Sequence, residues 1–206
     1  MDILIASTNV HEIRELRAML KKMRVFDVYS LHDFSNYTPT GISGSTFEAI
    51  SSEKAMHAAQ TLGMVSIASY SGLIVPTLEG LPGILSLTYA GPHATDKENR
   101  NKLLADMKHL EEADRYAYLE CYLTLATPDG VKKSTHGVSE GMILNQERGS
   151  YGYGYDTLFL KHDYSKTLGE LEEDTKNRIS HMRKAFDKLQ VTLDTLLDNA
   201  LLHRRV

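Results

Sequence analysis

Hydroxyl and amide side chains gather where the first predicted strand gives way to the first predicted helix. Residues 3–6 are apolar and predict a short buried strand, and Ser7, Thr8 and Asn9 follow it directly. Free backbone N–H groups at a helix N-terminus, together with such side chains, bind phosphate well. The same residue types also serve as ordinary helix caps. The triplet therefore indicates either a phosphate site or a simple cap.

A second stretch combines backbone freedom with aromatic rings and a carboxylate. Residues 149–156 are Gly-Ser-Tyr-Gly-Tyr-Gly-Tyr-Asp, which places three rings close to Asp156. This composition suits a planar ligand that stacks on a ring while Asp156 contacts its polar edge. The spacing does not match the Gly-x-Gly-x-x-Gly or Walker patterns, which argues against a dinucleotide site or a P-loop. A turn-rich sheet edge without a ligand is the open alternative.

The elements that must position these residues follow from hydrophobic periodicity and turn signals. We expect Asn9 to cap the first helix and Glu12 to reach back to it, as in a capping box. Strands are predicted at residues 3–6, 26–31, 64–68, 73–75, 116–127, 131–138 and 158–161. Helices are predicted from Val10 to about Met23, at 46–61, at 95–109 and from Asn177 or Ser180 onward. Helices interleaved with strands and one long hairpin favour an α/β fold with a mixed sheet, as a single domain over residues 1–206.

Composition limits the classes of partner. The chain has 206 residues, of which 42% are hydrophobic, enough for one sizeable core or for two lobes that share a sheet. The net charge of −4 argues against broad nucleic-acid binding. No apolar stretch approaches the roughly 20 residues that span a bilayer, and the single Cys121 cannot form an intramolecular disulfide. We therefore expect a cytoplasmic protein without a membrane or nucleic-acid partner.

The order and spacing of several segments resemble the inosine/xanthosine triphosphate pyrophosphatase family, from residue 3 to about residue 189. Tyr153-Gly154-Tyr155-Asp156 is similar to the family's Phe-Gly-Tyr-Asp, and Lys176-Asn177-x-x-Ser180-His181-Met182 to its Lys-Asn-x-x-Ser-His-Arg. Further segments with collinear spacing lie at residues 6–16, 46–55, 68–73, 80–91, 96–104, 115–121 and 137–143. Each segment alone is a weak signal, but their shared order identifies the family.

The resemblance implies a Mg2+-dependent enzyme that hydrolyses ITP, dITP or XTP to the monophosphate and pyrophosphate. It also implies a homodimer with an elongated mixed sheet, flanking helices and a nucleotide cleft between two lobes. In that family the first loop and a lysine hold the triphosphate, while a glutamate and paired aspartates serve the metal and activate water. An aromatic ring stacks on the base, and a lysine with a His-Arg pair contacts the purine carbonyl oxygens.

The residues that the resemblance assigns to the base are mostly retained. Tyr153 can stack as phenylalanine would. The neighbouring and purine-contacting positions are also occupied by family residues, namely Gly154, Tyr155, Asp156, Lys176 and His181. The exception is Met182, which stands at the position of the arginine and offers no hydrogen-bond donor.

The residues assigned to phosphate and metal are largely replaced. Retained are Ser7, Thr8, Asn9, Lys54 and Ser71. Glu12 stands where the family has a lysine, and Ala49 where it has the metal-serving glutamate. Ser69 and Tyr70 replace the two aspartates, although Mg2+ sites need anionic oxygen ligands and an ordinary tyrosine is a poor base at pH 7.

Two hypotheses follow. The first is a nucleoside triphosphate pyrophosphatase whose activity is weakened or altered by these replacements. The second is a catalytically silent relative that binds a purine nucleoside triphosphate or monophosphate, or a protein partner, through the retained fold. Release of pyrophosphate from ITP, XTP or dITP in the presence of Mg2+ distinguishes them.

Overall fold

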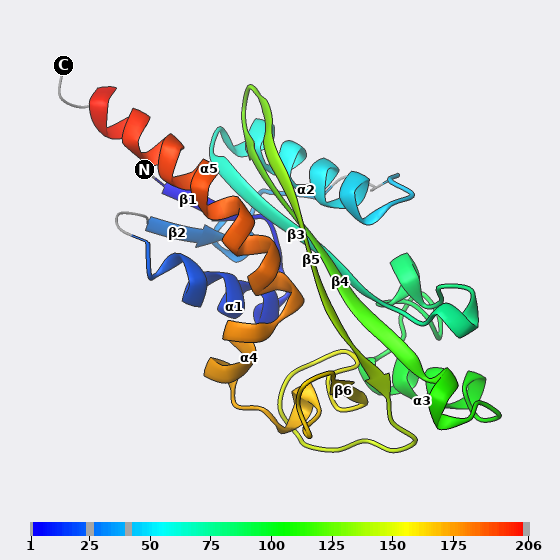
Figure 1. The fold of residues 1–206 in the computed structure, drawn as a ribbon. Coiled ribbons are helices and arrows are strands. Elements are labelled where there is room, and N and C mark those ends of the chain that lie inside the picture. The colour runs from blue at the N-terminus through cyan, green and yellow to red at the C-terminus, as the bar shows by residue number, and fades with distance from the viewer. Residues whose placement is uncertain (1, 24–26, 40–42, 204–206) are drawn as a thin grey trace. The chain divides into compact units, whose positions relative to one another are not determined.

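The strands build one mixed sheet. The computed structural model describes residues 2–23, 27–39 and 43–203. Six strands, β1 (Asp2–Ile5), β2 (Asp27–Ser30), β3 (Val65–Ile74), β4 (Tyr116–Thr127), β5 (Gly130–Ile143) and β6 (Phe159–Lys161), lie in the order β2-β1-β3-β4-β5-β6 (Figure 1). Strand β1 is parallel to β2 and β3, whereas β5 and β6 are antiparallel. The predicted α/β class with a mixed sheet is confirmed. Phe26 of the second predicted strand lies outside the described residues.

Three of the helices begin at side-chain caps, and the one at Asn9 was predicted. The helices are α1 (Val10–Leu20), α2 (Phe47–Leu62), α3 (Asp96–Asp106), α4 (Glu173–Ile179) and α5 (His181–His203). The side chains of Asn9 and Thr46 accept hydrogen bonds from the first turns of α1 and α2. Thr95 and Glu98 form a complete capping box on α3. Such caps satisfy N–H groups that have no partner inside the helix. No helix within the described ranges is long and apolar enough to cross a membrane.

The prediction was wrong in the middle of β3 and omitted α4, whereas Ser180 as a start of the last helix is confirmed, because α5 begins at His181. Residues 64–68 and 73–75 were expected to form separate strands, but one strand runs from Val65 to Ile74. The polar run 69–71 before Gly72 resembles a turn in the sequence, yet its backbone continues the ladder. Helix α4 was missed as a separate helix, because extended backbone at Ser180 (φ −65°, ψ 159°) separates it from α5.

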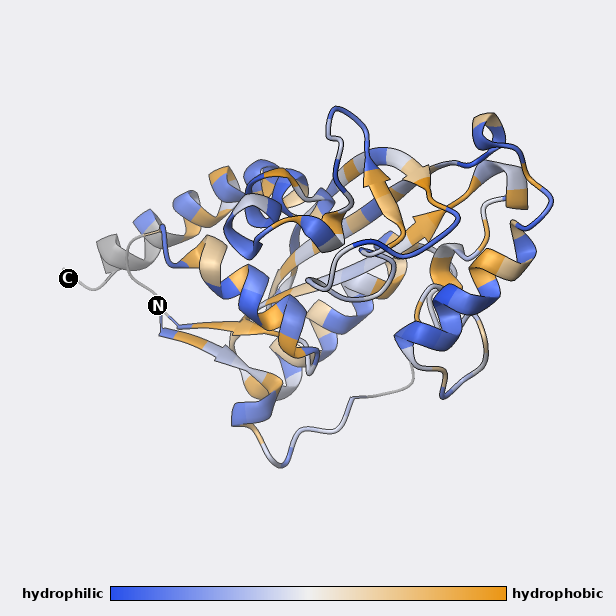
Figure 2. Ribbon diagram, turned by 90° about the horizontal axis from the view of Figure 1, so that it is seen from below, coloured by the Kyte–Doolittle hydropathy of each residue, from blue (hydrophilic) through white to orange (hydrophobic). Residues whose placement is uncertain are grey.

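Contacts divide the chain into two compact units. Unit 1 comprises residues 1–70, 121–137 and 182–206. Side-chain alternation along its strands sends Ile3, Ile5 and Ile67 to one face of the sheet, where they pack with α1 and α5. Leu4 and Ala68 point to the opposite face and pack with the alanine side of α2. Figure 2 shows apolar colour concentrated in the strands, while the helices carry both polar and apolar stripes.

Unit 2 comprises residues 71–120 and 138–181 and has a core of its own. Leu73, Leu103 and Phe159 belong to this core and are fully buried. The guanidinium of Arg115 is also buried, and it donates to the backbone carbonyls of Met107, Ile143 and Leu144. These bonds join the end of α3 to the end of β5. The loop at residues 149–156 belongs to this unit.

Candidate functional site

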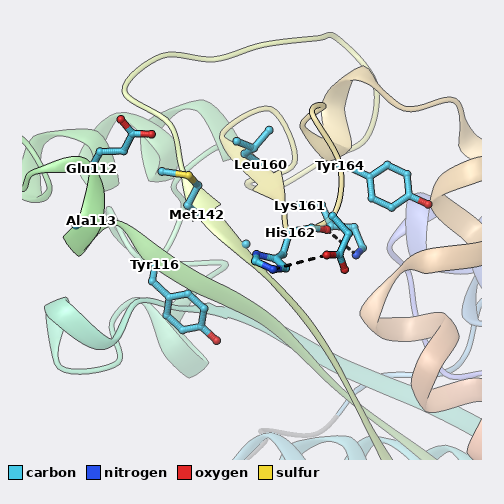
Figure 3. Close-up of a pocket in the computed structure, with 10 residues that line it drawn as sticks. Glu112, Ala113, Tyr116, Met142, Leu160, Lys161, His162 and Tyr164 are labelled. Atoms are coloured by element: carbon cyan, nitrogen blue, oxygen red, sulfur yellow. Dashed lines mark hydrogen bonds and ion pairs between the residues drawn. The ribbon is translucent and has the colours of Figure 1, made fainter.

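A pocket of about 360 Å³ opens in unit 2, but none of the sequence-predicted site residues lines it (Figure 3). Its wall includes Tyr116, Met142, Leu160, Lys161 and Tyr164. Lys161 is buried and its ammonium donates to the backbone carbonyl of His162. This mixture of apolar, aromatic and charged groups specifies no ligand class. The candidate site is therefore built from the residues that the sequence indicates.

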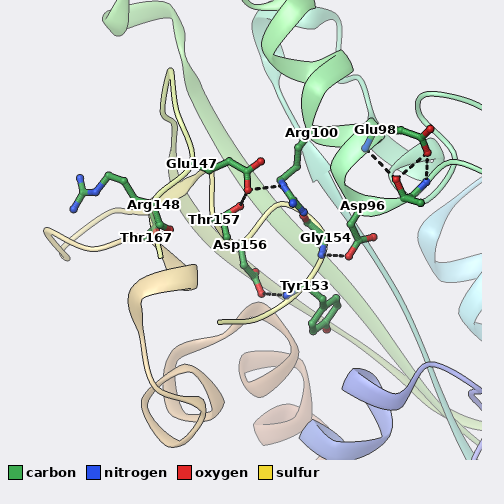
Figure 4. Close-up of polar contacts among 11 residues, drawn as sticks. Asp96, Glu98, Arg100, Glu147, Arg148, Tyr153, Gly154, Asp156, Thr157 and Thr167 are labelled. Carbon is green, nitrogen blue, oxygen red and sulfur yellow. Dashed lines mark hydrogen bonds and ion pairs between the residues drawn. The ribbon is translucent and has the colours of Figure 1, made fainter. Parts of the chain in front are cut away.

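The glycine-rich loop of unit 2 brings its backbone close to Asp156. Gly152 has a φ of +81°, and a Cβ atom there would lie 2.1 Å from Asp156 Oδ2. Only glycine fits this conformation and this close approach. The turn lets Asp156 Oδ2 accept a 2.9 Å hydrogen bond from the Tyr153 backbone N–H (Figure 4). This hydrogen bond links the Asp156 carboxylate to the backbone of Tyr153, whose ring is expected to stack on the purine.

Lys176 of α4 completes what we call the base cluster, defined as Tyr153, Asp156 and Lys176. Its ammonium donates to Asp156 Oδ2 at 2.5 Å, and the two side chains are only 8% and 7% exposed. The same nitrogen lies 4.2 Å from the centroid of the Tyr153 ring, in cation–π range. A ring and a carboxylate from the loop therefore converge with a cation from α4, as a site for a flat polar ligand requires.

Other residues assigned to the base occupy different surroundings. His181 is buried at the start of α5, directly after the extended Ser180. Met182 is fully buried in the apolar core of unit 1, so its side chain belongs to the packing. Arg183 does not replace the missing arginine, because its Nε is paired with Asp187 at 2.7 Å. Tyr155 is buried in the core of unit 2, and its hydroxyl donates to the carbonyl of Ser86.

The first loop of unit 1 differs from the expected capping box. Asn9 caps α1 as predicted, with Oδ1 accepting from the backbone N–H of His11 at 2.9 Å. Glu12 was expected to reach back to the Asn9 backbone, and this was wrong. The Asn9 N–H donates to Ser7 Oγ, and Ser7 Oγ donates to Glu12 Oε2 at 2.7 Å. We call Ser7, Asn9 and Glu12 the first-loop cluster. Thr8 is exposed, and its carbonyl contacts His32 Nε2.

Lys54 and Tyr70 lie together in unit 1. The Lys54 ammonium donates to the backbone carbonyl of Ser69 at 2.7 Å and lies 5.9 Å from the Tyr70 ring centroid. The half-buried Tyr70 ring packs against Phe47, with 5.8 Å between centroids. Burial, and secondly the Glu12 carboxylate, raise the pKa of Tyr70 above its ordinary value. Tyr70 is therefore protonated at neutral pH and cannot act there as the general base.

The positions that the resemblance assigns to Mg2+ do not fit the ion. Ala49 is aliphatic, and Ser69 and Tyr70 carry neutral oxygens, whereas Mg2+ sites use carboxylates in addition to substrate phosphates. The Oγ atoms of Ser69 and Ser71 are buried without a hydrogen-bond partner in the described part of the chain, but a hydroxyl supplies no negative charge. The described residues also contain no group of three or more His, Cys, Asp or Glu side chains that could hold a metal ion.

Sequence reasoning missed two residues that contact the glycine-rich loop. The Gly154 N–H donates to Asp96 Oδ2, and the Gly154 carbonyl accepts from Arg100 Nη1, both at 2.7 Å (Figure 4). The capping box pattern of α3 accounts for Thr95 and Glu98, and an acidic residue such as Asp96 in the first turn suits the helix dipole. No signal in the sequence therefore pointed to the contact with the loop.

Comparison with known proteins gives full-length matches. The model of the Ham1 family matches residues 3–192. A protein named dITP/XTP pyrophosphatase from Protochlamydia amoebophila is 48% identical over 199 residues, covering 96% of this chain and 100% of that relative. One of the same name from Chlamydia abortus is 48% identical over 205 residues, covering 99% and 100%. The solved Ham1 protein of Staphylococcus aureus has a TM-score of 0.83 at 33% identity, covering 95% of this chain and 99% of its own. That of Coxiella burnetii has a TM-score of 0.84 at 32% identity, with the same coverage.

Proposed function

This chain belongs to the Ham1 family, and we propose that it is a nucleoside triphosphate pyrophosphatase-type protein for deaminated purine nucleotides. Its reaction would add water across the anhydride bond between the α and β phosphates of ITP, dITP or XTP, releasing the monophosphate and pyrophosphate. The names of relatives that share nearly half of its residues support this assignment. We further propose that the loss of metal-serving and base carboxylates weakens the activity.

The base cluster is the observation that carries the proposal. The Lys176 ammonium has only donors, and it is fixed between the Asp156 carboxylate and the face of the Tyr153 ring. A 6-oxo purine presents an acceptor at the position where adenine presents an amino donor. A donor-only cation therefore favours inosine and xanthine over adenine. Met182 offers no donor at the position where the resemblance would supply an arginine, so one further donor to the purine is missing.

The first-loop cluster supports weakened turnover. Ser7, Asn9 and the N-terminus of α1 offer the donors that phosphate needs, but Glu12 places a carboxylate among them. Loss of one electrostatic stabiliser typically costs roughly 10²–10³-fold in rate, and loss of a general base roughly 10²–10⁴-fold. Such losses do not simply add. They nonetheless place the expected rate far below that of an intact site.

A second candidate function is purine-nucleotide binding without turnover. The hydrogen bond between Ser7 and Glu12 favours it, because a carboxylate already occupies donors that the triphosphate would use. In this case a nucleoside monophosphate would bind about as well as the triphosphate. We also propose that the protein is a cytoplasmic homodimer without nucleic-acid or membrane partners, and that residues 1–206 act as one functional domain.

The test is a pair of measurements on the purified protein. Calorimetry with IMP should give saturable binding, and AMP should bind more weakly. Tyr153→Ala should weaken IMP binding about tenfold, because stacking on a base is worth roughly 1–3 kcal/mol, while Tyr153→Phe keeps the ring and serves as the control. Pyrophosphate release from ITP, XTP and dITP, with and without Mg2+, then separates slow turnover from binding alone. Absence of binding by every purine nucleotide would contradict both candidates.

A further inference from the structure

We propose that Asp96 and Arg100 of α3 are positioning residues that hold the backbone N–H and the backbone carbonyl of Gly154. In doing so they fix the Tyr153 ring and the Asp156 carboxylate in the orientation that receives the base. The inference rests on the proposed function, because a purine is taken as the ligand of the base cluster. Helix α3 would then increase the affinity of the base cluster for a purine, a role that neither the loop motif nor the helix cap indicates.

The two contacts address the two polar ends of one residue. Asp96 Oδ2 accepts from the Gly154 N–H, and Arg100 Nη1 donates to the Gly154 carbonyl, each at 2.7 Å. Figure 4 shows Asp96 and Arg100 reaching the loop from the same helix. A spacing of four residues places both side chains on one face of α3. Because both bonds involve a charged group, they are stronger than bonds between neutral groups.

Arg100 is itself anchored by Glu147, which precedes the loop. Its Nε lies 3.0 Å from Glu147 Oε2, and the Arg100 side chain is only 15% exposed. The same Glu147 oxygen accepts from Thr157 Oγ1 at 2.8 Å. Glu147 precedes the loop and Thr157 follows it, so one carboxylate links the two ends to α3. The clamp, defined as Asp96, Arg100 and Glu147, therefore closes around residues 149–156.

The loop needs such support because its own sequence provides little. Gly149, Gly152 and Gly154 all have positive φ, and glycine loses more conformational freedom on ordering than any other residue. A Cβ atom at Gly154 would meet nothing within 4 Å, so no packing constrains this residue in the direction of a side chain. Nor does capping explain Asp96, because Thr95 and Glu98 already complete the capping box of α3. Ordering the loop before binding reduces the entropy that the ligand must offset.

The experiment compares Asp96→Ala and Arg100→Met with the unmodified protein. Amide hydrogen exchange of residues 150–156, followed by mass spectrometry, should become about tenfold faster in each variant. The dissociation constant of IMP should rise about tenfold, because the ligand then has to order the loop. Arg100→Lys retains a donor for the Gly154 carbonyl and should recover part of both effects. Lys102→Met is the matched control, since it removes another cation from α3 that pairs with Asp106 and does not contact the loop.

The possible failures are distinguishable. Unchanged exchange of residues 150–156 in both variants overturns the clamp, whether or not IMP binds. Faster exchange with an unchanged dissociation constant shows that the clamp does not position the base cluster and also overturns the inference. If the unmodified protein binds no purine nucleotide, the proposed function is contradicted, and so is the purine as the ligand of the base cluster. Equal effects from Lys102→Met would reveal a general loosening of α3 and contradict a specific role for Asp96 and Arg100.

Discussion

The Ser7 hydroxyl donates a 2.7 Å hydrogen bond to the Glu12 carboxylate, so an anion of the protein occupies a donor at the start of α1. Carboxylates are stabilised at helix N-termini by the helix dipole. Phosphates are bound there for the same reason. If the proposed function holds, the Glu12 side chain would compete with a substrate phosphate for the Ser7 hydroxyl. The Glu12 carboxylate also raises the pKa of Tyr70, after the larger effect of burial.

We predict that Glu12→Gln increases the preference for triphosphate over monophosphate. Glutamine can still accept from Ser7, but the repulsion of a phosphate charge disappears. That repulsion amounts to about 1 kcal/mol for charges near 4 Å in water, or about a fivefold change in the ratio of ITP to IMP affinity. Calorimetry at low and high salt should show the gain shrinking as salt rises. Asp27→Asn removes an exposed charge from β2 and is the control; an equal gain there would make the effect nonspecific.

We predict that Asp156→Asn strongly destabilises the protein. The substitution leaves the buried Lys176 ammonium without its carboxylate, which typically costs about 3–5 kcal/mol. For a chain of this size the melting temperature should fall by about 6–20 °C. Adding Lys176→Met should recover much of the loss, because no buried charge then remains unpaired. Asp106→Asn breaks the more exposed pair with Lys102 and should cost no more than about 1 kcal/mol. Equal losses from both single substitutions would contradict the buried pair.

The fold could be predicted where periodicity and caps agree. The apolar run at residues 3–6 and the cap at Asn9 specify β1 and α1 without any long-range information. The continuity of β3 could not be predicted, because residues 69–72 contain turn-forming types and only pairing in the sheet keeps them extended. Ser180 was one of two predicted starts of the last helix and α5 does begin directly after it, but the short helix α4 before it could not be predicted, since no apolar periodicity marks it.

The sequence predicted which residues belong to the candidate site, but not where their side chains point. Motif order indicated Tyr153, Asp156 and Lys176, and these side chains do meet. The direction of Glu12 was missed because the spacing from Asn9 matches a capping box, while the competing acceptor position beside Ser7 depends on the backbone turn between them. Burial of Met182 follows from the packing of α5 on the sheet, which no local pattern specifies.

We predict a homodimer in solution. The resemblance implies this state, and the substitutions at Glu12, Ala49, Ser69 and Tyr70 concern positions assigned to ligand and metal, not to subunit contacts. Light scattering coupled to size-exclusion chromatography should report about twice the chain mass of 23.1 kDa at micromolar concentration. A single monomeric species across that concentration range would show that the dimer has not been retained.

Restoring the replaced residues should rebuild catalysis. The quadruple variant Glu12→Lys, Ala49→Glu, Ser69→Asp, Tyr70→Asp supplies one cation for phosphate and three carboxylates for metal and base. The Lys54 ammonium already lies 2.7 Å from the Ser69 carbonyl oxygen, so a cation is present to pair with the carboxylates that the variant introduces. Metal ligands and base act as a unit, so single reversions should do little, whereas the quadruple variant should gain Mg2+-dependent hydrolysis of ITP or XTP by orders of magnitude.

Mg2+ itself provides the control for this experiment. The ion should raise the melting temperature of the quadruple variant and leave that of the unmodified protein unchanged, because only a bound ion stabilises the folded state. A triple variant that retains Tyr70 separates the base from the remaining ligands. Turnover of about 1 s⁻¹ or more by the unmodified protein would contradict the weakened site, since that rate is typical of intact enzymes. A folded quadruple variant that gains neither Mg2+ binding nor turnover would show that these four positions do not hold the roles assigned to them.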